Sequence, residues 1–153
     1  MSENNETNRL AIKTERYIAG AQLPAKSRPR DACYDLRAAH DAVIPPGRVV
    51  AVSTGLKIEV PDGYCLDIRP RSGLALNHSI TVLNSPGTVD STYRGEVKVI
   101  LANISPLMRY DVKAGDKIAQ CKLTREIAIS FEEVEHVRDN DERGGHGFGS
   151  SGR

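Results

Sequence analysis

The sequence predicts an all-β protein with at most one short helix. Its apolar residues occur in short runs rich in valine, isoleucine, leucine and tyrosine, and proline, glycine or aspartate separates one run from the next. Between these runs we find no amphipathic stretch of about 10–15 residues that would form a connecting helix. Short strands at this spacing are typical of an all-β sandwich or barrel.

The expected strands follow one another along most of the chain. They cover residues 10–18, 34–38, 48–52, 56–60, 64–68, 80–83, 96–104 and 117–129. The turn signals between them include residues 45–47, 61–63, 85–87 and 113–116, which are rich in proline, glycine and aspartate. The one place for a helix is a turn or two at residues 72–77, because Ser72 and Gly73 follow the strand-ending Pro70.

Composition narrows the class of protein. The chain has 153 residues, which is a length for one domain, and its 21 Lys and Arg residues balance 20 Asp and Glu residues for a net charge of +1. A general nucleic-acid binder usually has a strong basic excess, so no nucleic-acid partner is expected. No apolar run reaches the roughly 18 residues of a membrane span, so no membrane partner is expected. Three widely spaced cysteines favour a reducing compartment, and we expect a cytoplasmic protein.

The composition also divides the chain into three parts. Residues 1–9 are rich in asparagine and glutamate and are expected to be a disordered leader. Residues 10–135 are expected to form the all-β domain. Residues 136–153 have too few apolar side chains to order themselves, yet they contain Phe148 among glycines. We expect this tail to be flexible, and Phe148 either has no contact of its own or folds onto a partner or a ligand.

Two polar clusters interrupt the first half of the strand pattern. Asp35 lies in an apolar strand, where a carboxylate is costly unless a cation or other partner is near it, although a solvent-facing aspartate is equally compatible with the pattern. Arg71, Ser72 and Gly73 place a guanidinium, a hydroxyl and free N–H groups together. That combination suits an anion, but an ordinary helix cap would have the same residues.

Three further clusters follow. In residues 82–96, a Ser-Pro-Gly turn between strands predicts a hairpin that carries Asn84 and Asp90 on its inner walls, with Tyr93 nearby. A carboxylate there could activate a water and Tyr93 could stack on a sugar or base, although Asp90 could also only satisfy turn amides. Gln120 follows a Gly-Asp turn, and the tail reads Arg-Gly-Gly-His-Gly-Phe-Gly-Ser-Ser-Gly from Arg143.

Taken together, the five clusters resemble in order and spacing the five motifs of the homotrimeric dUTPase family (deoxyuridine 5′-triphosphate nucleotidohydrolases). The resemblance covers almost the whole chain from about residue 10 to residue 152. It implies a distorted jelly roll or β-barrel of the β-clip type, with a flexible C-terminal tail. Two positions depart from the family pattern, because Cys33 stands where glycine is usual and Ser151 where threonine is usual. Serine keeps the hydroxyl, whereas Cys33 adds a side chain beside the strand that carries Asp35.

The resemblance implies an enzyme that uses Mg²⁺ to hydrolyse dUTP to dUMP and pyrophosphate, through attack of water on the α-phosphorus. This lowers dUTP and supplies dUMP for thymidylate synthesis. Asp90 would be the catalytic base, Tyr93 would pack on the deoxyribose, and Asp35 would reach the metal through a water. The residues expected to bind substrate are Arg71, Ser72, Gly73, Asn84, Thr88, Val89, Asp90, Tyr93, Lys98, Gln120, Arg143, Phe148, Gly149, Ser150 and Ser151.

Within this set, Asn84 and the backbone near Thr88, Val89 and Lys98 would read uracil. The tail would close over the nucleotide, with Phe148 on the base and Arg143 on the γ-phosphate. The family is a homotrimer, with active sites at subunit interfaces and the tail given by a neighbouring chain. The alternatives are a dCTP deaminase or a bifunctional dCTP deaminase/dUTPase on the same fold, a non-catalytic nucleotide-binding protein, and an RNA-binding module.

Overall fold

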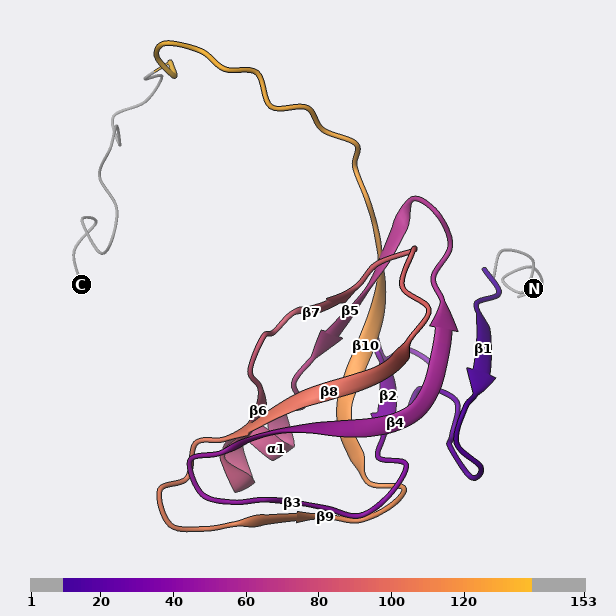
Figure 1. Ribbon diagram of the computed structural model, residues 1–153, viewed down its shortest axis with the longest axis vertical. Helices are drawn as coiled ribbons and strands as arrows, with labels where there is room; N and C mark the ends of the chain where they lie inside the picture. Colours follow the sequence, from indigo (N-terminus) through magenta and orange to yellow (C-terminus); the bar gives the residue numbers. More distant parts are fainter. Residues whose placement is uncertain (1–9, 139–153) are drawn as a thin grey trace, which may run out of the picture.

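The computed structural model describes residues 10–138, which form an all-β fold with one short helix within that range (Figure 1). The elements in chain order are β1 (Lys13–Arg16), β2 (Tyr34–Arg37), β3 (Ala42–Ile44), β4 (Val49–Glu59), β5 (Tyr64–Arg69), α1 (Ser72–His78), β6 (Ile80–Val82), β7 (Gly87–Val89), β8 (Glu96–Asn103), β9 (Tyr110–Val112) and β10 (Lys117–Arg125). In this part of the chain, no helix is long and apolar enough to cross a membrane.

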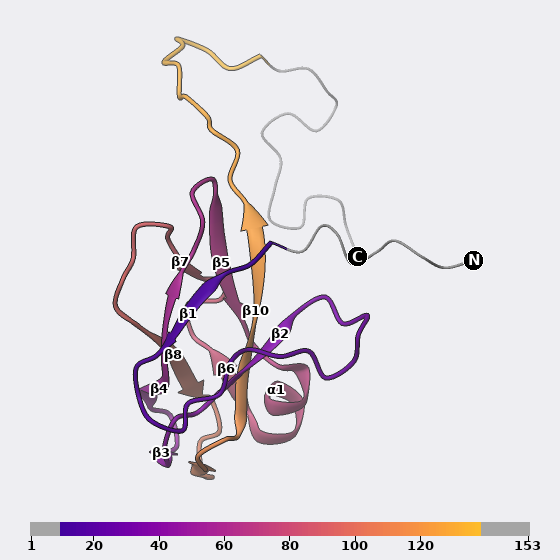
Figure 2. The ribbon, with the colours of Figure 1, turned by 90° about the vertical axis from the view of Figure 1, so that its right-hand side faces the viewer.

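Two four-stranded antiparallel sheets form the body of the molecule. The first has the strand order β1-β4-β8-β6 and the second has the order β2-β10-β5-β7, while β3 and β9 pair separately (Figures 1 and 2). Apolar side chains from both sheets pack into one core, among them Leu36, Leu56, Leu66, Val99 and Ile118. The structure therefore confirms the predicted all-β jelly-roll architecture.

The alternation of side chains along β8 separates the core from the outer face of the first sheet. Val97, Val99 and Leu101 are buried, whereas Lys98 and Ile100 are exposed. Successive side chains of a strand point to opposite faces, so Lys98 and Ile100 face away from the core. This places Lys98 on the surface, where a ligand can reach it.

The predicted strands 48–52 and 56–60 are wrong as separate elements, because they form the single strand β4. The pairing of β4 with β8 shifts its register between Ser53 and Leu56, and Gly55 adopts a φ of +67°. Such a shift is a β-bulge, in which an extra residue bends a strand without ending it. Thr54 and Gly55, which lie in the bulge, resemble a turn signal in the sequence, so the pattern predicted two strands where there is one.

The other differences concern the strand ends and the shortest strands. The first predicted strand, 10–18, is paired only at β1, and the last, 117–129, ends at Arg125 because residues 126–129 have no partner strand in the described chain. Strands β3 and β9, of three residues each, were not predicted. The predicted hairpin in residues 82–96 is wrong as a pairing, because β6 pairs with β8 in the first sheet and β7 pairs with β5 in the second. Beyond β10, residues 126–138 leave the body as an arm without helix or strand (Figures 1 and 2).

Candidate active site

A cleft of about 730 Å³ lies between β7, the β7–β8 loop and β8, and we call it the hairpin cleft. It brings together the residues that were expected to meet the base, the sugar and the attacking water. These are Asn84, Thr88, Val89, Asp90, Tyr93 and Lys98. The cleft therefore combines an amide, a carboxylate, a phenol ring and an ammonium group on one concave surface.

Backbone pairing fixes the position of Asp90. Strand β7 pairs with β5 through Val89 and Leu66, and Asp90 comes directly after this pair. The N–H of Tyr93 donates a hydrogen bond to the backbone oxygen of Asp90 at 3.1 Å, which closes a turn. Because the strand end and the turn both restrain Asp90, its exposed carboxylate is held at the wall of the cleft.

Two glycines leave space for cleft side chains. A Cβ at Gly95 would lie only 2.6 Å from Cζ of Tyr93, and a Cβ at Gly87 would lie 3.2 Å from Nδ2 of Asn84. The Tyr93 hydroxyl donates a hydrogen bond to the backbone oxygen of Glu96 at 2.9 Å. Sequence reasoning missed Gly95 and Glu96 as site residues, although both follow Tyr93 within the third motif.

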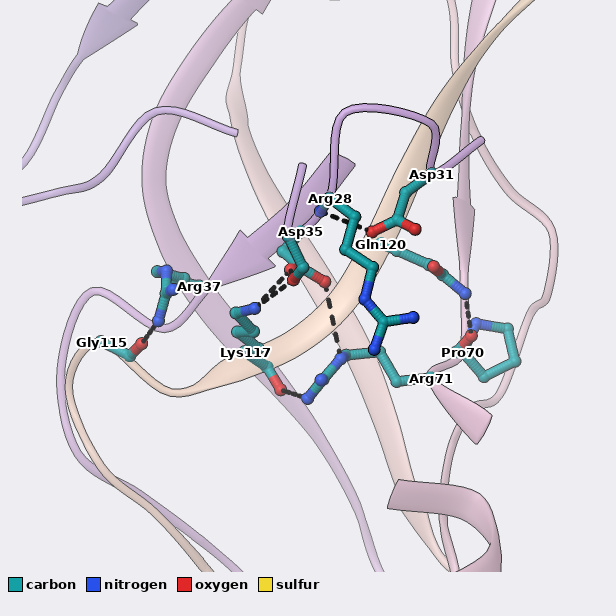
Figure 3. A network of polar contacts seen from close by, with 10 residues as sticks. Arg28, Asp31, Asp35, Arg37, Pro70, Arg71, Gly115, Lys117 and Gln120 are labelled. Atoms are coloured by element: carbon teal, nitrogen blue, oxygen red, sulfur yellow. Dashed lines mark hydrogen bonds and ion pairs between the residues drawn. The ribbon is translucent and has the colours of Figure 1, made fainter. Parts of the chain in front are cut away.

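A second group of polar residues meets where β2, β10 and the β5–α1 connection lie side by side, and we call it the Asp35 cluster (Figure 3). It consists of the predicted residues Asp35, Arg71 and Gln120, together with Ser27 and Lys117. Asp35 lies 2.7 Å from Nζ of Lys117 and 3.6 Å from Nε of Arg71, and it accepts a hydrogen bond of 2.7 Å from the Ser27 hydroxyl. Arg71 also donates to the backbone oxygen of Lys117 at 2.9 Å.

The environment of Asp35 favours its ionised form. Its partial burial would by itself raise the pKa of the carboxyl group, but hydrogen bonds from Lys117 and Ser27 act in the opposite direction. With the positive charges of Lys117 and Arg71, they hold the pKa of Asp35 below its usual value. The sequence analysis did not select Lys117 or Ser27, although Lys117 directly follows the Gly-Asp turn of the fourth motif.

The remaining predicted phosphate-binding residues lie at the same place. Gln120 is opposite Asp35 in the β10–β2 pairing, and its amide donates to the backbone oxygen of Pro70 at 2.9 Å (Figure 3). Ser72 and Gly73 directly follow Arg71 as the first residues of α1. The hairpin cleft is lined by none of these residues, so a single chain divides the predicted site between two surfaces.

Cys33, which stands at the usual glycine position, is half-buried beside Tyr34. Tyr34 pairs with Cys121 across β2 and β10. Burial, together with the proximity of Cys33 and Asp35, raises the pKa of the Cys121 thiol to about 12. Cys121 is therefore a protonated, buried thiol at neutral pH, and it packs as part of the core.

The predicted tail residues Arg143, Phe148, Gly149, Ser150 and Ser151 lie outside the described residues 10–138. Their expected contacts with the substrate therefore stay predictions from the sequence. The described part of the arm ends at Arg138, which precedes the glycine-rich motif by a few residues.

Comparison with known proteins places the two surfaces in a functional context. The family model described as dUTPase matches residues 19–152. A deoxyuridine 5′-triphosphate nucleotidohydrolase from Thermobifida fusca is 48% identical over 94% of this chain and 79% of the relative. The enzyme of the same name from Solibacter usitatus is 48% identical over 95% of this chain and 98% of the relative.

Solved structures show the same fold. The dUTPase of Staphylococcus bacteriophage 80alpha with dUPNHPP has a TM-score of 0.83 at 22% identity, and the match covers 94% of this chain and 99% of that chain. A mutant dUTPase from phage phi11 of S. aureus, in which a structural Mg(II) ion is coordinated, has a TM-score of 0.76 at 19% identity over 83% of this chain and 98% of that chain.

The all-β fold and the divided polar site therefore define a nucleotide-hydrolysing enzyme of the kind that these relatives represent. More narrowly, the chain belongs to the dUTPase family.

Proposed function

We propose that this chain hydrolyses dUTP to dUMP and pyrophosphate, with deoxyuridine in the hairpin cleft and the triphosphate at the Asp35 cluster. The observation that carries most weight is that Asn84, Asp90 and Tyr93 line one cleft. An amide can read a base edge, a fixed carboxylate can take a proton from water, and an aromatic ring can pack on a sugar. The matched family model and the relatives named above are dUTPases, and none of them is a dCTP deaminase.

The base is recognised by its hydrogen-bonding edge. Uracil presents an acceptor at O4 and a donor at N3, and cytosine presents the reverse. Asn84 and the backbone near Thr88, Val89 and Lys98 supply the complementary groups in our proposal. A wrong base would leave buried groups unpaired, at a cost of about 1–3 kcal/mol for each group. The methyl group of thymine would clash with the wall of the hairpin cleft.

Asp90 orients and deprotonates the attacking water. Its carboxylate is fixed at the end of a paired strand and is accessible from the cleft. A positioned general base of this kind contributes about 10²–10⁴-fold to a rate. The proton of the water goes to Asp90, the oxygen bonds to the α-phosphorus, and pyrophosphate leaves. Tyr93 covers the sugar and leaves no space for a 2′-hydroxyl.

The Asp35 cluster holds the phosphate chain. Arg71 supplies a guanidinium, and Ser72, Gly73 and Gln120 supply hydroxyl, N–H and amide donors. The N–H of Gly73 is near the start of α1, and the Gln120 amide lies beside Pro70. Charge-assisted hydrogen bonds from arginine to phosphate are stronger than neutral ones, so Arg71 is the main anchor.

The donor set fits Mg²⁺ bound mainly by the substrate. Magnesium prefers oxygen ligands and keeps several waters, and phosphates usually complete its coordination. Asp35 is an ionised carboxylate, but Lys117 and Arg71 already occupy its oxygens, which favours contact through a water. Among residues 10–138, no group of three or more His, Cys, Asp or Glu side chains could hold an ion alone. When bound, Mg²⁺ would offset the charge of the phosphates and polarise the α-phosphorus.

A homotrimer would join the two surfaces, since one chain divides the predicted site between them. Exposed apolar side chains support such an assembly. Val49, Leu83 and Ile100 are exposed on β4, the β6–β7 turn and β8 at 50%, 59% and 37%. In the arm, Ile127, Ile129 and Phe131 alternate with small or polar residues and are 82%, 72% and 95% exposed. This period of two is that of a strand awaiting a partner sheet.

The proposed reaction is tested by measuring pyrophosphate release from dUTP, UTP, dCTP and dTTP, with Mg²⁺ and with excess EDTA. We expect rapid release from dUTP with Mg²⁺, at least about 100-fold slower release from the other nucleotides, and a strong loss with EDTA. Ammonia release from dCTP would identify a deaminase. Equal cleavage of all four nucleotides would contradict the proposed reading of base and sugar.

A further inference from the structure

The carboxylate of Glu96 contacts three neighbouring groups, although Glu96 lies at the end of a strand. It is the first residue of β8 and directly follows Gly95, and its side chain is only 13% exposed. One carboxylate oxygen accepts hydrogen bonds from the Ser53 hydroxyl and from the N–H of Gly55, the latter at 3.0 Å. The other carboxylate oxygen lies 3.7 Å from Nζ of Lys98.

These contacts replace backbone pairing that the β4 bulge removes. The β4–β8 register shifts between Ser53 and Leu56, so the N–H of Gly55 lies where the regular ladder is interrupted. The bulge is tightly packed, because a Cβ at Gly55 would lie 2.9 Å from the Cβ atoms of both Ile18 and Ala21. The Gly55 oxygen also accepts the N–H of Tyr17 at 2.8 Å. Glu96 therefore ties the beginning of β8 to a fixed point in the neighbouring strand.

The same residue holds the ring of Tyr93. The Tyr93 hydroxyl donates to the backbone oxygen of Glu96 at 2.9 Å, and the ring lies against Gly95. Tyr93 itself belongs to an exposed loop and is 45% exposed, so little else restrains its ring. A shift of Glu96 would move the wall of the cleft on which the sugar is proposed to pack.

We infer that Glu96 is a positioning residue that fixes Tyr93 against the sugar and thereby sets the preference for deoxyribose over ribose. This inference rests on the proposed function, because it assigns Tyr93 to the sugar. Glu96 acts through Tyr93 and does not touch the reacting atoms. The contacts of the Glu96 carboxylate hold the first residue of β8 in place. The backbone oxygen of Glu96 then holds the Tyr93 hydroxyl and so positions the phenol ring.

The test is the ratio of kcat/KM for dUTP to kcat/KM for UTP. In Glu96→Ala we expect this ratio to fall by about tenfold, since loss of the hydrogen bonds at the bulge releases the ring. Glu96→Gln keeps an oxygen that can accept from Ser53 and Gly55, and should keep the ratio within about twofold of the wild type. Glu59→Ala is the matched control: Glu59 is the last residue of β4, and its replacement removes only an exposed ion pair with Lys13 of β1, so the ratio should stay unchanged.

Tyr93→Phe tests the hydrogen bond between the Tyr93 hydroxyl and Glu96 without disturbing the Glu96 carboxylate. It keeps the ring and removes the hydroxyl, so the ratio should fall by about two- to tenfold. A purely structural role for Glu96 would lower both kcat/KM values together and leave the ratio unchanged. An unchanged ratio in folded Glu96→Ala, or in Tyr93→Phe if Glu96→Ala does not fold, would overturn the inference. A wild-type protein that does not hydrolyse dUTP would instead refute the proposed function.

Discussion

Replacing Asp90 with asparagine is expected to lower kcat for dUTP by about 10²–10⁴-fold and to leave the affinity for dUTP nearly unchanged. Asparagine has almost the same shape as aspartate but cannot take a proton from the attacking water. The turn that follows β7 uses the backbone oxygen of Asp90, and so it survives the substitution. Stopped-flow measurement of pyrophosphate release and equilibrium titration with a non-hydrolysable dUTP analogue would give the two quantities separately.

The control for this substitution is Asp62→Asn. Asp62 is an exposed aspartate in the turn between β4 and β5, outside both the hairpin cleft and the Asp35 cluster. Its replacement should change neither kcat nor affinity. If Asp90→Asn retained the wild-type kcat, another group would have to be the base, and the role assigned to the hairpin cleft would be wrong.

Removal of residues 143–153 is expected to lower kcat/KM for dUTP by at least about 70-fold. Stacking of a base on an aromatic ring contributes about 1–3 kcal/mol, and a charge-assisted hydrogen bond to phosphate contributes about 1.5–3 kcal/mol. Phe148 and Arg143 are the residues proposed to supply these contacts, so both contributions are lost in the truncated protein. Steady-state kinetics would measure the loss, and size-exclusion chromatography would check that the assembly is intact.

A finer comparison separates the two tail contacts. Phe148→Ala alone should lower kcat/KM by about 5–150-fold, since it removes only the stacking contribution. His146→Ala lies in the same segment and removes a ring that has no assigned contact, so it should have little effect. A truncated chain with wild-type kinetics would show that the tail is not a lid.

Much of the fold could be predicted from the sequence because its strands have clear limits. Strands β2, β5, β6 and β8 differ from the predicted ranges by one residue each. The bulge in β4 could not be predicted, since the backbone at Gly55 depends on packing against Ile18 and Ala21. Interactions between distant segments decide such a case, and a local pattern contains no information about them.

The candidate site was predictable by residue type but not by arrangement. The sequence identified Asp90 and Tyr93 as chemical groups suited to a water and a sugar, and they do line one cleft. It gave no sign that Lys117 would contact Asp35, because a cation at a strand end has many possible partners. Nor could it show that Glu96 contacts the bulge, since the bulge itself was unpredicted.

The proposal that two chains complete each site is tested most directly by mixing two inactive variants, Asp90→Asn and Arg71→Ala. Each chain keeps the surface that the other has lost. If one chain provides the hairpin cleft and another the Asp35 cluster, random trimers of equal amounts contain intact sites at about one quarter of positions. We therefore expect dUTP hydrolysis to recover to about 25% of the wild-type rate after unfolding and refolding the variants together. No recovery in mixed trimers would mean that each site lies within one chain, and would contradict the account.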